Sequence, residues 1–374
     1  MLKRTALYPA HQQLGARLVD FGGWEMPVQY TSITEEHLAV RNAAGMFDIS
    51  HMGEVTVSGS AAADFLNRVL TNDIRKLSPG TGQYTLMCNE RGGVVDDLYA
   101  YQLSQGVYFL IINASRVPED VAWLQAQAAQ FPGELKLTDA SHNYSAVALQ
   151  GPRVPEFINT VIPGGSTSAM RVNAVTDLKK NQIGGFKFKN HCVFVARTGY
   201  TGEDGFEIIG EDESIKRFWN QCLEAGRPFG LKPAGLGARD TLRTEVCYPL
   251  YGHELNEETT PVEAGLGFFV ALDKGDFNGR RVCADQKASG VGKKCVAFKM
   301  TGKSAPPRPH YPIWFNGEKV GEVVSGTQSP SLGVGIGMGY VPSAVAQPDT
   351  AIEIEIRGQR CPAVVVKKPI YRKP

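Results

Sequence analysis

The last quarter of the chain consists of short segments in which apolar and polar residues alternate. Three such segments, at 295–300, 311–324 and 350–366, follow the polar stretch DQKASGVGKK (285–294), which we interpret as a linker. An Asn-Gly pair at 316–317 marks a turn within the second segment. Alternation with a period of two is typical of strands that have one buried face. The region beyond the linker is therefore predicted to fold as a small all-β barrel or sandwich.

Glycine occupies every second position of GVGIGMGY (333–340) in this region. In a strand these four glycines share one face, which lets another backbone or a flat group approach closely. The spacing does not match the G-x-G-x-x-G of a dinucleotide site, and no helix follows it. TGKS at 301–304 is not a phosphate-binding P-loop either, because Ala297 stands where that motif requires glycine.

The length and the glycine content favour several strand-rich domains. A chain of 374 residues is too long for one ordinary core and fits two or three domains. Its 41 glycines are about 11% of the residues, against a typical level of about 7%, which indicates many turns. Helix-like segments at 32–45, 60–70, 118–131 and 213–226 are interspersed with strand-like ones, so an α+β class is predicted.

The charge and the cysteine pattern exclude several classes of protein. With 39 basic and 38 acidic residues, the formal charge of +1 gives no general attraction to nucleic acid or to an anionic membrane. The seven cysteines contain no C-x-x-C pair, which argues against a zinc site or a disulfide framework and favours a reducing compartment. The first 23 residues lack the apolar run of a secretory signal, and no stretch is long enough to cross a bilayer. A cytoplasmic protein is expected.

Two adjacent carboxylates, Asp96 and Asp97, interrupt the strand-like run GGVVDDLYAY (92–101). Neighbours in a strand point to opposite faces, so these two cannot form an acid–base dyad in one pocket. One of them could face a cavity while the other is solvated. The structural alternative is a strand-end carboxylate that accepts hydrogen bonds from the turn at Gly92-Gly93.

Three glycines break the run RTGYTGEDGFEI (197–208) around Tyr200, Glu203 and Asp204. Loops of this kind commonly carry binding groups. A carboxylate here could accept two parallel N–H bonds from a heterocycle that has a ring N–H beside an amino group. The alternative is a surface turn whose acids lie in solvent.

Arg239 and Arg243 lie four residues apart in a helix-like segment and so share one helical face. Two guanidinium groups there suit a ligand that carries a carboxylate. They suit equally well structural ion pairs with Asp240, Glu245 or another acid of the chain.

The seven histidines give little sign of a metal site. His51, in DISHMGE (48–54), could titrate near neutral pH. A single histidine beside a strand is more often a hydrogen-bonded core residue. The other six show no spacing typical of metal ligands, so no metal site is predicted.

Eight motifs follow one another between residues 20 and 333: DFGGWEMPVQY, GMFDISHMGE, GGVVDDL, ALQGP, RTGYTGEDGFEI, GLGARDTLR, TTPVEAGLGF and SGTQSPSLG. Each motif is modest alone, but the set in this order is specific. In these motifs the chain resembles the T-protein family, the aminomethyltransferases of the glycine cleavage system.

The resemblance implies an α+β fold of three domains, set as a cloverleaf around a central folate channel, with antiparallel sheets plus helices and a C-terminal all-β barrel or sandwich. The expected domains are residues 1–50 with 142–230, residues 51–141 with 231–284, and residues 285–374. The resemblance also implies tetrahydrofolate as the acceptor substrate, without metal or nucleotide, and the lipoyl-carrying H-protein as the partner. Neither nucleic acid nor membrane is expected as a partner, and we expect a monomer or a weak dimer.

The resemblance also implies site residues, by position in the matching motifs. Asp96 falls on the essential acid, Glu203 on the glutamate that binds the pterin ring, and Arg239 on an arginine of the folate site. The other implied folate-site residues are Met52, Tyr84, Tyr101, Asn113, Tyr200, Phe268 and the C-terminal Arg372. Phe268 departs from the family pattern, because many members have tryptophan there. Phenylalanine keeps an aromatic face but loses the N–H donor.

Two other functions stay open at this point. A tetrahydrofolate-dependent demethylase of the same fold would take a methyl group from a small sulfur compound or an N-methyl amine. A non-catalytic folate-binding protein would scaffold or regulate a partner without transferring any group.

Overall fold

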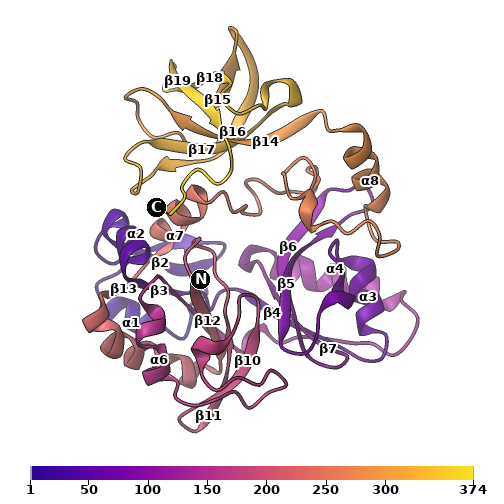
Figure 1. The fold of residues 1–374 in the computed structure, drawn as a ribbon, viewed down its shortest axis with the longest axis vertical. Coiled ribbons are helices and arrows are strands. Elements are labelled where there is room, and N and C mark those ends of the chain that lie inside the picture. The colour runs from indigo at the N-terminus through magenta and orange to yellow at the C-terminus, as the bar shows by residue number, and fades with distance from the viewer. Residues whose placement is uncertain (1, 374) are drawn as a thin grey trace. The chain divides into compact units, whose positions relative to one another are not determined.

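The protein divides into two units in a computed structural model that describes residues 2–373 (Figure 1). The first unit contains the chain up to Thr85 together with Asp97–Arg239, and the second contains Leu86–Asp96 and the chain from Asp240 onward. Helices and sheets are mixed in the first unit, and a closed barrel is the main element of the second. The α+β class and the C-terminal all-β barrel are thus confirmed. The three-domain division stays a prediction.

A six-stranded sheet in the order β10-β11-β12-β9-β3-β13 is the larger sheet of the first unit. Its strands are β3 (Ala44–Asp48), β9 (Ser145–Gln150), β10 (Ile183–Phe188), β11 (His191–Ala196), β12 (Gly205–Gly210) and β13 (Leu231–Pro233). Only β13 and β3 run parallel. Two helices, α5 (Ile158–Val161) and α6 (Asp212–Gly226), belong to the same core, in which Phe218 and Trp219 lie with Val147 and Phe206. Because β3 and β9 are buried along their whole length, they carry almost continuous apolar residues.

A second sheet, in the order β5-β6-β7-β4-β8, carries both adjacent aspartates. Its strands are β4 (Gly53–Ser58), β5 (Thr81–Cys88), β6 (Val94–Ser104), β7 (Val107–Ile112) and β8 (Lys136–Asp139), and the helices α3 (Ala62–Val69) and α4 (Val117–Ala129) accompany them. Strands β5, β6 and β7 are consecutive in the chain and neighbours in the sheet, so they form a meander. The division between the two units crosses β5 and β6.

The N-terminal segment contains α1 (Tyr8–Gln13), the hairpin of β1 (Arg17–Phe21) and β2 (Trp24–Gln29), and α2 (Ile33–Asn42). Ser32 caps α2, since its Oγ accepts a hydrogen bond of 3.2 Å from the Glu35 N–H. The expected helix end at Gly45 is wrong, because the helix ends at Asn42 and Gly45 lies in the buried strand β3. A Cβ at Gly45 would lie 2.3 Å from Val40 Cγ2, so close packing and not a helix stop explains this glycine.

The closed barrel of the second unit follows the order β14-β17-β16-β15-β18-β19, and β14 also pairs with β19 (Figure 1). Its strands are β14 (Lys293–Met300), β15 (Pro312–Phe315), β16 (Glu318–Gln328), β17 (Gly335–Pro342), β18 (Ala351–Ile356) and β19 (Gln359–Val366). Three of the four alternating glycines lie in β17, and Gly333 precedes it. A Cβ at Gly337 would lie 2.5 Å from Ser325 O, and a Cβ at Gly339 would lie 2.6 Å from Glu322 O. The glycine face therefore admits the neighbouring strand β16.

The interpretation of 285–294 as a linker is wrong. Helix α8 (Arg280–Ser289) covers its first half, and β14 begins at Lys293. The helix was missed because most of its side chains are polar and face solvent, while Cys283 is buried. Helix α7 (Leu236–Glu245) is the other long helix of this region, and it crosses the division between the units.

Glu54 in β4 is a buried carboxyl group that the sequence pattern did not single out. The residue is 1% exposed, and its Oε2 has no hydrogen-bond partner among the described residues. Burial, helped by the nearby Asp139 carboxylate, raises the pKa of Glu54 to about 9. Glu54 is therefore protonated at neutral pH.

Replacing Glu54 with glutamine should make folding stability less dependent on pH. The pKa of Glu54 is raised in the folded protein above its ordinary value near 4.5, so the folded state holds a proton that the unfolded state loses. The wild type should therefore lose stability relative to Glu54→Gln as the pH rises from about 5 towards 9. Between about pH 6 and pH 8 the difference should grow by about 3 kcal/mol, since each pH unit between the two pKa values corresponds to about 1.4 kcal/mol. Urea unfolding at both pH values measures it, with the exposed Glu90→Gln as the control, and a pH-independent difference would refute the assignment.

Candidate functional site

Asp96 is fully buried in β6. Its neighbours on the same strand face, Val94 and Leu98, are also buried, while Asp97 on the opposite face is partly exposed. The burial therefore follows the expected alternation of the strand. A carboxylate in such a place is costly to desolvate, which makes it an unusual choice for a purely structural position.

The N–H groups of the turn before β6 form hydrogen bonds with Asn89. The N–H of Gly92 donates to Asn89 O, and the N–H of Gly93 donates to Asn89 Oδ1, each over 3.0 Å. A Cβ at Gly93 would lie 1.7 Å from Glu257 O, which explains the glycine there. The structural alternative for Asp96 stays a prediction beside the functional one.

Asp97 is held by two of the residues that the resemblance implies for the folate site. Tyr84 Oη donates to Asp97 Oδ2 over 2.9 Å, and Asn113 Nδ2 donates to Asp97 Oδ1 over 3.0 Å. Asn113 Nδ2 also lies 3.1 Å from Asp97 O. Asp97 thus fixes the orientation of both side chains, a role that the sequence pattern did not assign to it.

The two acids of the glycine-broken loop at 197–208, Glu203 and Asp204, lie in different environments. Glu203 Oε1 accepts a bond of 3.1 Å from Arg41 Nη1, and the side chains of this pair are only 4% and 2% exposed. Arg41 Nη1 also donates to Thr201 O over 2.6 Å. Asp204 instead forms a two-bond ion pair with Arg197 at 3.0 and 2.5 Å, and Arg197 holds the pKa of Asp204 below its usual value. Glu203 is therefore the inward acid of the loop, braced by an arginine that sequence reasoning missed.

Arg239 lies over the ring of Tyr200, with its Cζ 4.8 Å from the ring centroid. Its Nη1 is enclosed and has no hydrogen-bond partner among the described residues. Burial lowers the pKa of Arg239, and Glu207 opposes this effect. The Tyr101 hydroxyl lies 3.0 Å from Thr198 Oγ1, and Thr198 Oγ1 donates to Glu207 Oε2 over 2.6 Å. Tyr101 is therefore linked through Thr198 to Glu207, the acid that acts on Arg239.

His51 and Met52 follow β3 in a tight turn, where the Met52 N–H donates to Ile49 O over 3.0 Å. His51 is 3% exposed, and its Nδ1 has no hydrogen-bond partner among the described residues. Burial lowers the pKa of His51 to about 4, with a further lowering by Arg239 and a rise caused by Asp48. The imidazole is therefore neutral at physiological pH.

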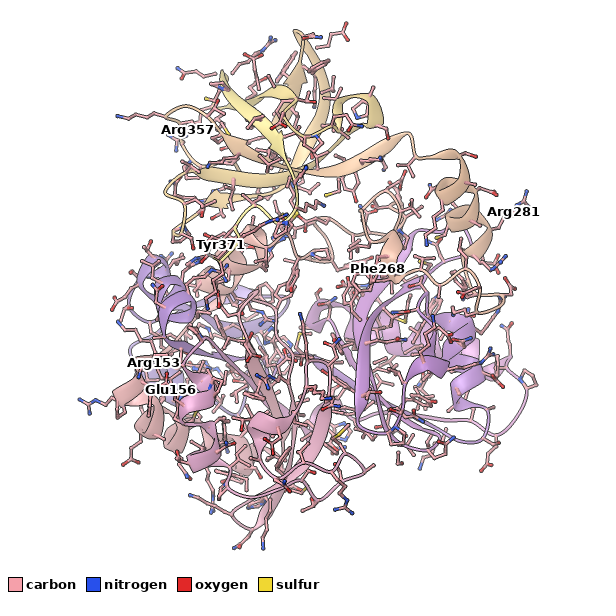
Figure 2. The ribbon with its side chains drawn as sticks, viewed as in Figure 1. Arg153, Glu156, Phe268, Arg281, Arg357 and Tyr371 are labelled. Carbon is pink, nitrogen blue, oxygen red and sulfur yellow. The ribbon has the colours of Figure 1, made fainter. Side chains whose placement is uncertain are left out.

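Seven of the predicted site residues lie in the first unit and three in the second. The first unit holds Met52, Tyr84, Tyr101, Asn113, Tyr200, Glu203 and Arg239, and the second holds Asp96, Phe268 and Arg372. Phe268, in the 3-10 helix η7 (Gly267–Phe269), is 92% exposed (Figure 2). Its ring meets the Phe269 ring edge-on, with the ring centroids 5.5 Å apart. Arg372 is exposed as well.

Arg243 is a structural residue. Its guanidinium donates to Asp240 Oδ1 over 2.7 Å, to Glu254 Oε2 over 2.9 Å and to Ser325 Oγ over 2.8 Å. The predicted alternative of ion pairing is confirmed for Asp240 but not for Glu245, which accepts hydrogen bonds from Ser329 and Ser331. Arg239, by contrast, keeps an enclosed Nη1 without a partner among the described residues.

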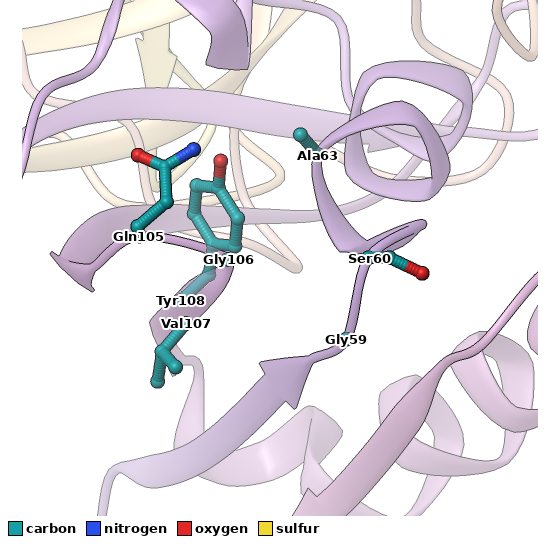
Figure 3. A pocket seen from close by; sticks show the side chains of 7 residues that line it. All are labelled: Gly59, Ser60, Ala63, Gln105, Gly106, Val107 and Tyr108. Atoms are coloured by element: carbon teal, nitrogen blue, oxygen red, sulfur yellow. The ribbon is translucent and has the colours of Figure 1, made fainter.

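Residues 2–373 contain no group of three or more His, Cys, Asp or Glu side chains that could hold a metal ion. None of their helices has the length and apolar character needed to cross a membrane. A shallow pocket of ≈350 Å³ lies between the start of α3 and the β6–β7 turn (Figure 3). It is lined by Gly59, Ser60, Ala63, Gln105, Gly106, Val107 and Tyr108, none of which is a predicted site residue.

The first unit thus carries Glu203 on a glycine-broken loop, held by the buried Arg41 of α2, and a closed six-stranded barrel follows in the chain. Residues 7–274 match the family model described as the GCVT N-terminal domain, and residues 293–372 match the glycine cleavage T-protein C-terminal barrel domain. The chain belongs to the glycine cleavage T-protein family, so the resemblance inferred from the motifs is confirmed.

Relatives of similar length are named as aminomethyltransferases. The chain is 46% identical over 379 residues to the aminomethyltransferase of Bacillus mycoides, with 100% of this chain and 99% of the relative covered, and 45% identical with the same coverage to that of Bacillus cytotoxicus. The crystal structure of the glycine cleavage system aminomethyltransferase T from Bartonella henselae superposes with a TM-score of 0.89 at 32% identity, covering 99% of this chain and 98% of that one. The chain is therefore an enzyme of the aminomethyltransferase class, which transfers a one-carbon unit.

Proposed function

We propose that this enzyme takes the aminomethyl group from the lipoyl arm of H-protein and passes its carbon to tetrahydrofolate. The products are ammonia, 5,10-methylenetetrahydrofolate and dihydrolipoyl H-protein. The reaction balances because the C–S and C–N bonds of the aminomethyl group break while two C–N bonds form to N5 and N10, whose protons end on sulfur and on ammonia. The supporting observation is the pair of enclosed nitrogens, Arg239 Nη1 and His51 Nδ1, that have no partner among the described residues. Such groups are costly unless a ligand completes them.

The residues of the first unit fit a reduced pterin. In this proposal Glu203, oriented by Arg41, accepts the ring N–H and the adjacent exocyclic amine in a charge-assisted pair. Tyr200, pinned under Arg239, supplies an aromatic face. Arg239 directs its unpartnered N–H groups at an oxygen of the ligand or balances an acid of the site.

Asp96 is assigned the electrostatic and proton-transfer role. The migrating carbon passes through an iminium-like cation, and a carboxylate aimed at it stabilises the developing positive charge. The same carboxylate can accept the proton released as a folate nitrogen bonds to that carbon. Its burial in β6 supports this assignment, because a dry site strengthens both effects.

Replacing Glu203 with glutamine should weaken tetrahydrofolate binding at least about tenfold, because the amide loses one charge-assisted acceptor. Isothermal calorimetry measures the affinity. The matched control is Asp204→Asn on the same loop, whose partner is the partly exposed Arg197, and it should bind as the wild type does. Equal affinity of Glu203→Gln and the wild type would remove Glu203 from the pterin site.

One assay distinguishes the proposed reaction from the alternatives. The enzyme is incubated with tetrahydrofolate, with and without aminomethylated H-protein, and ammonia and methylenetetrahydrofolate are measured. We expect both products only when H-protein is present. Methyl transfer from a small donor without H-protein would indicate the demethylase, and folate binding without ammonia release would indicate a non-catalytic protein.

A further inference from the structure

His51 occupies a position that the protein alone does not satisfy. No hydrogen bond joins its Nδ1 to any described residue, and the residue is 3% exposed. The Phe21 ring meets the imidazole edge-on, with the ring centroids 5.6 Å apart. An enclosed polar nitrogen without a partner lowers stability. The fold therefore tolerates a cost that a bound molecule could offset.

His11 shows what a structural histidine looks like in the same unit. Its Nε2 lies 2.8 Å from Asp48 Oδ2, and its Nδ1 lies 2.9 Å from Tyr30 Oη. Both ring nitrogens of His11 are thus satisfied in a site with no exposure. The contrast rules out burial alone as the reason for the missing bond of His51 Nδ1.

The acid nearest to His51 is already engaged. Asp48 Oδ2 accepts bonds from Thr5 and His11, and Asp48 Oδ1 accepts the Ser50 N–H over 2.9 Å. Asp48 therefore offers His51 a charge but not a hydrogen bond. The other charged group that acts on His51 is Arg239, which repels a proton from the imidazole.

The neutral imidazole of His51 and the Arg239 guanidinium are near enough for the charge of Arg239 to act on the imidazole, and the His51 Nδ1 is enclosed without a partner among the described residues. The enclosed Nη1 of Arg239 also lacks a partner among the described residues. Two donors that carry no acceptor of their own fit a carbonyl or carboxylate oxygen better than any group that donates. Tetrahydrofolate has both kinds of oxygen, one on the pterin ring and others on the glutamate tail.

We propose that His51 is a positioning residue of the folate site, whose Nδ1–H, together with Arg239, binds an oxygen of the bound folate. This inference rests on the proposed function and adds a residue to it. His51 takes no part in bond making. It holds the folate so that N5 and N10, the atoms that accept the carbon, have one orientation.

The test compares His51→Leu with His11→Leu in two measurements. For His51→Leu we expect a melting temperature of the free protein equal to or above that of the wild type, because an unsatisfied nitrogen is removed. We also expect tetrahydrofolate affinity, measured by calorimetry, to fall about tenfold. For His11→Leu we expect the melting temperature to fall by several degrees, since two hydrogen bonds and a buried acid lose their partner. His51→Asn, whose amide can donate from a similar place, should recover part of the affinity.

A second ligand distinguishes the two folate oxygens that His51 could bind, the ring carbonyl and an oxygen of the tail. A tetrahydropterin without the aminobenzoyl-glutamate tail should lose affinity in His51→Leu if the oxygen is the ring carbonyl, and should keep it if the oxygen belongs to the tail. A His51→Leu protein that melts lower but binds tetrahydrofolate as the wild type does would overturn the inference and leave the proposed function standing. A wild type that binds no tetrahydrofolate would overturn both.

Discussion

Asp96→Asn should lower turnover at least about a hundredfold while folate binding is largely kept. The amide has the size of the carboxylate but can neither accept the proton nor balance the cationic carbon. Because Asp96 is fully buried in β6, no carboxylate from the solution can reach its place. Ammonia release from aminomethylated H-protein measures turnover, and calorimetry with tetrahydrofolate measures binding.

The neighbouring Asp97→Asn is the matched control for this variant. Asp97 is next along the same strand but faces the other side and holds Tyr84 and Asn113. Its replacement should therefore act mainly on KM for tetrahydrofolate, through loss of orientation of these two side chains, and only weakly on kcat. Near-normal turnover of Asp96→Asn, or a larger kcat loss in Asp97→Asn, would end the assignment of Asp96 as the acid–base residue.

Arg243→Met should destabilise the protein by about 3–5 kcal/mol, the second large effect that we expect. Arg243 and Glu254 are each 2% exposed and 2.9 Å apart, and Glu254 Oε1 has no partner among the described residues even in the wild type. Loss of the guanidinium leaves a buried carboxylate without its cation. Asp240, whose side chain is 48% exposed, can turn to water instead. Urea unfolding at neutral pH measures the loss.

Two further variants make this stability result interpretable. Arg153→Met removes the surface ion pair with Glu156, labelled in Figure 2, and should cause no measurable change, because both partners are solvated. The double variant Arg243→Met with Glu254→Gln should recover much of the lost stability, since no unpaired charge remains. If the double variant is as unstable as Arg243→Met, the loss comes from packing and not from the buried charge.

Local sequence patterns predicted the elements whose cause is local. The helix-like segment at 32–45, which contains α2, and the alternation that buries Asp96 both depend on residues a few positions apart. The barrel was predicted for the same reason, because each of its hairpins shows its own period of two.

Partners that are distant in the sequence could not be predicted in this way. Arg41 braces Glu203 from 162 residues away, and no spacing rule connects them. The same holds for Ser325, which binds Arg243 across 82 residues. The helix of 280–289 was missed because its apolar side is narrow. The adjacent aspartates show the limit most clearly: the pattern placed them on opposite faces, but only the structure showed that Asp97 organises Tyr84 and Asn113.

A crystal structure of the protein with tetrahydrofolate bound is the most direct test of the central claim that the Asp96 carboxylate acts on the atoms that accept the carbon. The account predicts an Asp96 carboxylate oxygen within about 3 Å of N5 or N10, or joined to one of them through a single water. An Asp96 side chain that is directed away from both nitrogens, with no bridging water, would contradict it.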